Sequence, residues 1–160
     1  MNQVYLLIGG NLGDRFDFLK KARQGIENKI GKLVEVSSIY ETAPWGFEAE
    51  QNFLNQVILA QTDLSPQEVL RFCLGIEDEL GRERESEQYE SRTMDIDILF
   101  FNDEIIETKD LTVPHPKLHQ RRFTLEPLAE IAPRFMHPVF NKTLQELLHL
   151  CEDQSQVNKM

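Results

Sequence analysis

Two aspartates lie two residues apart in an apolar segment, and this spacing suits the binding of a metal ion. Residues 94–101 are expected to form a strand, on which residues two apart face the same side. Asp95 and Asp97 therefore point one way, and the apolar residues between and beside them point the other. Neighbouring carboxylates repel each other unless a cation offsets them, and Mg²⁺ commonly takes one or two carboxylates together with phosphate oxygens. A solvated strand face is the alternative.

Basic residues flank this segment on both sides. Before it come Arg82, Arg84 and Arg92, and after it come His115, Lys117, Arg121 and Arg122. Arginine suits phosphate because its planar guanidinium donates two hydrogen bonds. In a chain of formal net charge -10, arginines around an Asp-x-Asp strand favour a polyphosphate ligand. The alternative is that they pair with the glutamates of the same region.

A third group of residues suits a flat heterocycle. The loop Thr42-Ala43-Pro44-Trp45-Gly46 precedes a segment in which Phe53 and Asn55 share one strand face. An aromatic ring stacks on a flat heterocycle, and a carboxamide binds the donors and acceptors along its edge. The residues indicate a flat polar ring without specifying which one. A core Phe beside a structural Asn is the alternative.

Hydrophobic periodicity predicts the elements that must position these residues. Strands are expected over residues 4–8, 33–40, 53–61, 94–101 and 111–113. Helices are expected over 16–30, 65–80 and 124–132, and a fourth begins near residue 143. Capping boxes, Ser65 to Glu68 and Thr143 to Glu146, predict the starts of the second and fourth helices. A glycine-rich stretch, 9–14, ends the first strand and lacks the lysine of a phosphate-binding loop. A hairpin turn is expected at 102–103, and a mobile loop at 82–93. The order predicts an α+β fold, a ferredoxin-like βαββαβ core with extra C-terminal strands and helices in an αβα sandwich.

Bulk properties narrow the class of protein. The 160 residues suit a single catalytic domain, residues 1–152, followed by a frayed tail, 153–160. The acidic charge argues against a nucleic-acid binder. Apolar runs are too short for a membrane span, the start of the chain has no signal-peptide features, and Cys73 and Cys151 are interpreted as reduced thiols. We therefore expect a cytoplasmic protein. It is expected to be a monomer, because no heptad pattern or apolar stripe demands a partner.

Short motifs in a fixed order run through nearly the whole chain. They are Gly9 to Leu12, Ser38-Ile39-Tyr40-Glu41-Thr42-Ala43-Pro44, Phe53-Leu54-Asn55, Glu77 with Gly81-Arg82, Arg92-Thr93-Met94-Asp95-Ile96-Asp97-Ile98, Leu111-Thr112-Val113-Pro114-His115, Arg121-Arg122-Phe123, and Glu126-Pro127-Leu128 with Ile131-Ala132-Pro133. On these motifs the chain resembles the 6-hydroxymethyl-7,8-dihydropterin pyrophosphokinase family of folate biosynthesis. The resemblance covers all but the C-terminal tail.

The resemblance implies a reaction and a set of site residues. It implies transfer of the diphosphoryl group of ATP to the hydroxymethyl pterin, with release of AMP and with two Mg²⁺ ions held by Asp95 and Asp97. The catalytic residues it implies are Arg82, Arg92, Asp95 and Asp97. The ATP-binding residues it implies are Leu70, Arg71, Glu77, Arg84, Arg92, Ile98, Thr112, His115 and Arg121. The pterin-binding residues it implies are Thr42, Ala43, Pro44, Trp45, Gly46, Phe53, Asn55, Tyr89 and Phe123.

Other functions remain as alternatives at this point. A kinase acting on another acceptor, or a non-catalytic Mg-ATP-binding module, would keep the two aspartates. An RNA-binding sheet of the same fold is disfavoured by the acidic charge and by the absence of a basic aromatic strand. For the pterin reaction, we expect the loops 42–51 and 82–92 to order when both substrates bind, because water would otherwise hydrolyse ATP.

Overall fold

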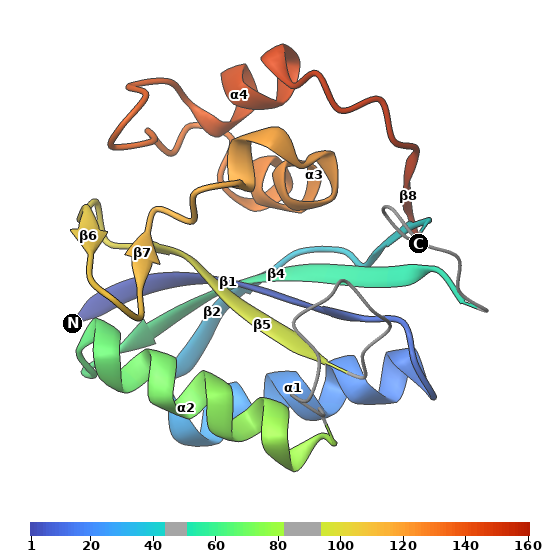
Figure 1. Ribbon diagram of the computed structural model, residues 1–160, viewed down its shortest axis with the longest axis vertical. Helices are drawn as coiled ribbons and strands as arrows, with labels where there is room; N and C mark the ends of the chain where they lie inside the picture. Colours follow the sequence, from blue (N-terminus) through green and yellow to red (C-terminus); the bar gives the residue numbers. More distant parts are fainter. Residues whose placement is uncertain (44–50, 82–93) are drawn as a thin grey trace.

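The computed structural model describes residues 1–43, 51–81 and 94–160, and in it an antiparallel sheet lies between two layers of helices (Figure 1). The strands of the sheet are β1 (Asn2–Gly10), β2 (Lys32–Val36), β3 (Tyr40–Thr42), β4 (Phe53–Thr62), β5 (Asp95–Phe101) and β8 (Val157–Lys159). Their order is β5-β1-β4-β3-β8, and β2 also pairs with β4. This order confirms the predicted ferredoxin-like core.

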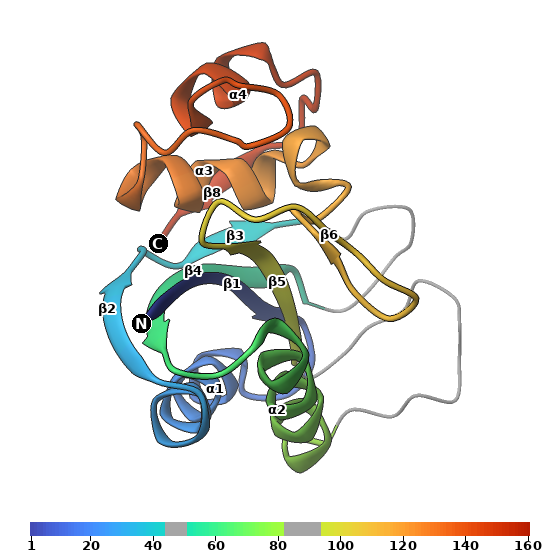
Figure 2. The ribbon, with the colours of Figure 1, turned by 90° about the vertical axis from the view of Figure 1, so that its left-hand side faces the viewer.

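The helices cover both faces of the sheet (Figure 2). One face carries α1 (Arg15–Lys29) and α2 (Pro66–Glu79), and the other carries α3 (Arg122–Ile131) and α4 (Leu144–Leu150). A second small sheet of β6 (Ile106–Glu107) and β7 (Thr112–Val113), followed by the 3₁₀ turn η1 (Leu118–Gln120), connects β5 to α3. Within the described ranges, none of these helices has the length and apolar composition needed to span a membrane.

Two separate hydrophobic clusters result, one on each face of the sheet. Along β1, Val4, Leu6 and Ile8 belong to the cluster under α1 and α2, whereas Tyr5 and Leu7 belong to the cluster under α3 and α4. Alternate residues of a strand face opposite sides, so a strand covered on both faces is apolar throughout. This explains the continuous apolar run that predicted the first strand.

The predicted capping boxes open two of the helices. The Ser65 side chain accepts a hydrogen bond from the Glu68 backbone N–H, and the Glu68 carboxylate accepts one from the Ser65 backbone N–H. Thr143 and Glu146 repeat this arrangement at α4. Each pair satisfies two backbone donors that a helix start leaves free.

The structure divides the strand predicted over 33–40 into β2 and β3, and the interruption lies at Ser37. The hydroxyl of Ser37 accepts a hydrogen bond from the Val57 backbone N–H at 2.9 Å, and the Ser37 carbonyl accepts one from the Gln56 side chain at 2.7 Å. A serine side chain that takes the place of a ladder partner interrupts regular strand pairing.

Of two further predictions about the C-terminal half, one is confirmed only in part and the other is wrong. The turn at 102–103 is present, because the Glu104 N–H donates to the Phe101 carbonyl at 3.0 Å, but Asn102 hydrogen-bonds with Gln3 of β1 and the chain does not return along β5 as a hairpin. The strand that follows, β6, pairs with β7 instead. The tail is not frayed, since β8 pairs with β3 and the Met160 N–H donates to the Ile39 carbonyl at 2.8 Å. Backbone hydrogen bonds at a sheet edge can hold a largely polar segment in place.

Candidate active site

A pocket opens on the α3 side of the sheet. Most of the predicted site residues within the described ranges line it. Its lining consists of Leu7, Gly9, Thr42, Ala43, Phe53, Asn55, Asp95, Asp97, Arg121, Phe123 and Ser155. Eight of these eleven are predicted site residues. They come from β3, β4, β5 and the start of α3, segments that are far apart in the sequence. The fold therefore assembles the acidic pair and the aromatic residues in a single cavity.

The two aspartates take the orientation that the strand period predicts. Asp95 and Asp97 are half-buried and line the pocket, while Ile96 and Ile98 lie in the cluster under α1 and α2. In the register of the sheet, Gly9 is paired with Asp95 on one side and with Asn55 on the other. One row across the sheet thus presents a carboxylate, a gap and a carboxamide to the pocket.

The gap in this row is at Gly9, which the sequence pattern predicts to end the first strand. A Cβ atom placed on Gly9 would lie 2.1 Å from Oδ1 of Asn55 and 2.8 Å from the Leu54 carbonyl oxygen. Gly9 is therefore needed for the close approach of Asn55, and it leaves space above the sheet. Gly9 lies inside β1 and not after it. A glycine inside a strand often marks a place where another part of the backbone or a ligand comes close, and this signal could have identified Gly9 from the sequence.

Thr42 contributes a buried polar atom to the pocket. Its side chain is 5% exposed, and its Oγ1 has no hydrogen-bond partner among the residues that the structure describes. An unsatisfied buried hydroxyl costs free energy unless a ligand supplies the partner. Together with Asn55, it gives the pocket two groups that can recognise the polar edge of a heterocycle.

The start of α3 supplies a cation and a second aromatic ring. Arg121 is the residue before the first turn of α3, and Phe123 lies in that turn. The guanidinium carbon of Arg121 is 5.6 Å from the centre of the Phe123 ring. Both side chains line the pocket with Phe53. Phe53 and Phe123 thus offer two aromatic surfaces to a flat ligand, beside a positive charge.

His115 lies near this site without lining the pocket. Its backbone N–H donates to the Leu99 carbonyl at 3.0 Å, which attaches the segment after β7 to β5. Its Nδ1 accepts a hydrogen bond from the Lys117 N–H at 3.2 Å. Burial, together with the positive charges of Arg121 and Lys117, lowers the pKa of His115 to about 4 against the opposing effect of Asp95. The imidazole is therefore neutral at pH 7, with Nε2 as its donor.

The remaining predicted ATP ligands lie outside the pocket. Leu70 packs against the cluster under α1 and α2, Ile98 is part of that cluster, and Glu77 is buried on α2. Arg71 is exposed, with its guanidinium 5.7 Å from the Phe72 ring, and Thr112 is exposed on β7. Their roles stay predictions. Seven predicted residues lie outside the described ranges, namely Pro44, Trp45, Gly46, Arg82, Arg84, Tyr89 and Arg92, and so do most of the two loops expected to order.

The donor set of the pocket fits Mg²⁺ that is shared with a phosphate ligand. Across residues 1–43, 51–81 and 94–160, no three His, Cys, Asp or Glu side chains form a complete metal cluster. Asp95 and Asp97 provide only carboxylate oxygens. Mg²⁺ is characteristically held by one or two carboxylates, with water and substrate phosphates completing its octahedron. The residues present therefore fit a metal that binds together with a polyphosphate.

Comparisons with known proteins agree with this assembly of residues. Residues 5–133 match the family described as 7,8-dihydro-6-hydroxymethylpterin-pyrophosphokinase. A 2-amino-4-hydroxy-6-hydroxymethyldihydropteridine pyrophosphokinase of Aquifex aeolicus is 44% identical over 146 residues, covering 91% of this chain and 90% of the relative. The enzyme of the same name from Bacillus subtilis is 47% identical over 131 residues, covering 81% and 78%.

Solved structures show the same fold. The Plasmodium falciparum HPPK-DHPS structure superposes with a TM-score of 0.76 at 20% sequence identity, and the match covers 94% of this chain. This chain spans 43% of that longer one.

Proposed function

This chain belongs to the 7,8-dihydro-6-hydroxymethylpterin-pyrophosphokinase family, and we propose that the pocket at Asp95 and Asp97 is its active site. The enzyme is a pyrophosphokinase of folate biosynthesis, which transfers the diphosphoryl group of ATP to the hydroxymethyl group of 6-hydroxymethyl-7,8-dihydropterin and releases AMP. The observation that carries the assignment of the site is the convergence of two carboxylates, two aromatic rings and a carboxamide on one pocket.

The pterin side of the site is formed by β3, β4 and the start of α3. Phe53 and Phe123 stack on the two faces of the ring, since flat aromatic surfaces are the natural partners of a flat heterocycle. Asn55 and the unsatisfied Thr42 hydroxyl hydrogen-bond to its polar edge. Ala43 lines the same wall, and Pro44, Trp45, Gly46 and Tyr89 complete it in this proposal.

The ATP side is formed by the acidic pair and the basic residues around it. Asp95 and Asp97 would hold two Mg²⁺ ions, which would supply positive charge to offset that of the phosphates. In this proposal Arg121, the Nε2–H of neutral His115 and Arg84 donate to the polyphosphate. Arg82 and Arg92 stabilise the charge of the transferring group. Leu70, Arg71, Glu77, Ile98 and Thr112 are assigned to the remainder of the nucleotide site.

The reaction is an in-line substitution at phosphorus. The hydroxymethyl oxygen of the pterin forms a bond to the β-phosphorus of ATP, and the bond from that phosphorus to the α,β-bridging oxygen breaks, so that AMP leaves. Asp95 accepts a hydrogen bond from the attacking hydroxyl and orients it, and the hydroxyl proton passes to this carboxylate or to water. Positioning and charge neutralisation supply most of the rate acceleration in phosphoryl transfer.

The experiment that tests this proposal measures AMP formation from ATP and Mg²⁺ with and without the pterin. Wild type is compared with Asp97→Asn, and Asp63→Asn, at an exposed aspartate before α2, is the matched control. We expect pterin-dependent AMP from wild type and the control, and a loss of at least about a hundredfold in Asp97→Asn.

Other outcomes favour the alternatives. ATP binding without AMP would favour a non-catalytic Mg-ATP-binding module, and AMP formed with a different acceptor would favour a kinase of other specificity. Full activity in Asp97→Asn would show that Asp97 is not a required metal ligand. A cytoplasmic location and a monomeric state stay predictions.

A further inference from the structure

The C-terminal tail, residues 153–160, is attached to the start of α3 by two hydrogen bonds between Asp153 and Arg122, called the clasp below. The Arg122 backbone N–H donates to Oδ2 of Asp153 at 3.0 Å, and Nε of Arg122 donates to the Asp153 carbonyl oxygen at 2.9 Å. No side chain from α3 itself caps this helix start. The first N–H groups of a helix lack partners within the helix, so Asp153 acts as the cap from a distant part of the chain.

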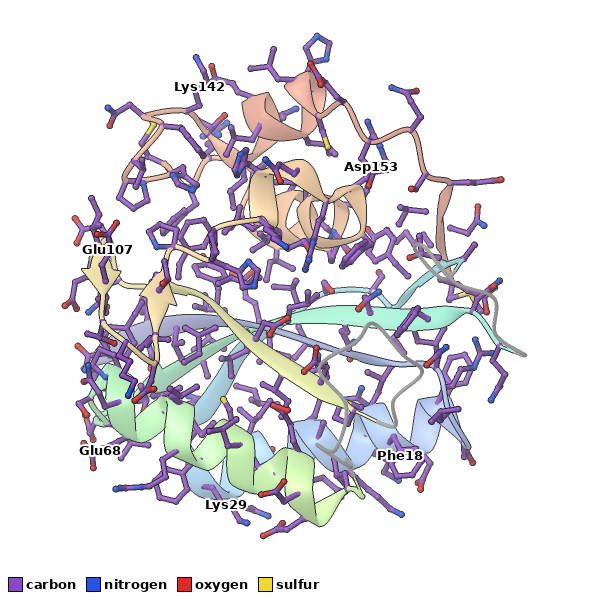
Figure 3. All side chains as sticks on the ribbon, viewed as in Figure 1. Phe18, Lys29, Glu68, Glu107, Lys142 and Asp153 are labelled. Carbon is purple, nitrogen blue, oxygen red and sulfur yellow. The ribbon has the colours of Figure 1, made fainter. Side chains whose placement is uncertain are left out.

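A second residue of the tail, Ser155, also holds the Asp153 carboxylate in place. Oδ1 of Asp153 accepts a hydrogen bond from the Ser155 backbone N–H at 2.9 Å. Burial opposes the ionisation of Asp153, but the hydrogen bonds from Ser155 and Arg122 outweigh it and lower the pKa of this carboxyl. Asp153 is therefore ionised at neutral pH and uses both oxygens as acceptors. Figure 3 labels Asp153 beside α3, where the chain passes from α4 towards β8.

The tail is fixed a second time, at the edge of the sheet. Val157 is paired with Thr42 and Lys159 with Tyr40 in the register of β8 and β3. The tail thus runs from the start of α3 to β3, and these two segments carry Arg121, Phe123 and Thr42 of the pocket. Between the two attachments Ser155 itself lines the pocket. The tail therefore connects both sides of the proposed pterin site and closes the gap between them.

We propose that Asp153 is a positioning residue for the pterin, holding Arg121 and Phe123 in place through Arg122, and that the tail at Ser155 is a wall of the same site. Arg122 lies between the two pocket residues and is fixed by both its backbone and its side chain, so the clasp limits how far the start of α3 can move. The proposal rests on the proposed function. It assigns a role in substrate binding to a segment outside the motifs that carry the family resemblance.

The test compares Asp153→Asn with Glu152→Gln in the full chain. Glu152 is the exposed neighbouring acid, so its substitution makes the same change of charge without touching the clasp. Asparagine keeps one acceptor oxygen, so one of the two N–H groups loses its partner. We expect the KM for the pterin to rise about tenfold in Asp153→Asn, with kcat at saturating pterin within about threefold of wild type, and no change in Glu152→Gln. Thermal unfolding separates this effect from a loss of folded protein.

If Asp153→Asn does not fold, a second variant still tests the tail. Ser155→Val leaves both Arg122 hydrogen bonds to Asp153 in place, removes the contact of the Ser155 side chain with that carboxylate and adds bulk at the pocket wall, so we expect it to raise the pterin KM as well. If Asp153→Asn folds and its pterin KM equals that of Glu152→Gln, Asp153 does not position the pterin-binding residues. An unchanged pterin KM in Ser155→Val would overturn the proposal that Ser155 forms a wall of the pterin site. Because wild type must first show pterin-dependent AMP formation, failure of the proposed function is distinguishable from failure of this inference.

Discussion

Gly9 and Asn55 lie opposite each other on β1 and β4, so close that a single methyl group on Gly9 would lie 2.1 Å from Oδ1 of Asn55. Non-bonded heavy atoms do not approach to this distance, so either the carboxamide or the strand must move when a side chain is added there. Because Asn55 is a proposed pterin ligand, this pair links the backbone of β1 directly to substrate recognition.

The first prediction concerns Gly9→Ala. We expect the pterin KM to rise at least about tenfold, because Asn55 is displaced, and the free energy of unfolding to fall by about 1–3 kcal/mol through overpacking. Steady-state kinetics and urea unfolding measure the two effects. Gly75→Ala is the control, because a Cβ at Gly75 meets no atom within 4 Å. Alanine in the helix should leave kinetics unchanged and stabilise the fold by up to about 1 kcal/mol. Unaltered pterin kinetics in Gly9→Ala would contradict the prediction.

The second prediction concerns the unsatisfied hydroxyl of Thr42. Thr42→Val should leave the free energy of unfolding unchanged or raise it by about 1 kcal/mol, because no hydrogen bond within the described protein is lost. The same change should weaken pterin binding about tenfold, which calorimetry with the pterin can measure.

Thr62→Val is the matched control for this change. Thr62 is also buried, but its hydroxyl donates to the Ile30 carbonyl at 2.7 Å and accepts from the Leu64 N–H at 3.1 Å. We expect Thr62→Val to destabilise the fold by about 1–3 kcal/mol and to leave pterin binding unchanged. A Thr42→Val variant that loses stability and keeps its affinity would reverse the assignment.

The third prediction concerns Glu130, which ties the end of α3 to the sheet. Its carboxylate accepts hydrogen bonds from the Ser38 N–H at 3.0 Å, the Ser38 hydroxyl at 2.8 Å and the Tyr40 hydroxyl at 2.8 Å. Glu130→Ala should cost about 2 kcal/mol of unfolding free energy, because three donors lose a charged acceptor. Glu79→Ala, which removes the exposed ion pair with Lys29, should cost less than about 1 kcal/mol in the same urea titration. Equal losses in the two variants would show that the Glu130 network contributes little.

The fourth prediction concerns the pH dependence of stability. His137 is 2% exposed, and its Nδ1 accepts hydrogen bonds from the Val139 and Phe140 N–H groups at 3.1 and 3.3 Å. Burial and the nearby His119 lower the pKa of His137 to about 4, against 6.5 for the ordinary side chain. Between these values the unfolded chain binds a proton that the folded chain does not. Stability is therefore fully present above pH 6.5 and is lost as the pH falls towards 4.

His137→Asn isolates this contribution, because the asparagine Oδ1 can accept the same N–H groups and does not titrate. His115 has a lowered pKa as well and remains in both proteins, so the difference between them belongs to His137. We expect wild type to lose on the order of 2 kcal/mol more than His137→Asn between pH 7 and pH 4.5. His149→Asn, at an exposed position on α4, should follow wild type. Parallel profiles for wild type and His137→Asn would rule out the effect.

The sequence predicted the core of the fold and the acidic pair because both depend on local periodicity. The alternation around Asp95 and Asp97 fixes which side each carboxylate faces once the strand forms, and the capping boxes fix where two helices begin. These signals lie within a few neighbouring residues. They are therefore visible before any tertiary contact is known.

What the sequence did not predict depends on contacts between distant residues. The role of Gly9 appears only when β4 places Asn55 beside it, and the order of the tail depends on a free edge of β3 and on Arg122, about thirty residues earlier in the chain. Ser155 lines the pocket for the same reason. No pattern within the polar tail itself carries this information.

The sheet has a practical consequence for anyone who wishes to engineer this enzyme. The cluster under α1 and α2 meets the opposite side of β1, β4 and β5 from the pocket. Repacking around Leu19, Ala22 and Ile26 can therefore raise heat resistance while the substrate-facing surface keeps its original residues. Such a reinforced scaffold would tolerate costly changes on the catalytic side, so that acceptor specificity could be explored with fewer variants lost to misfolding.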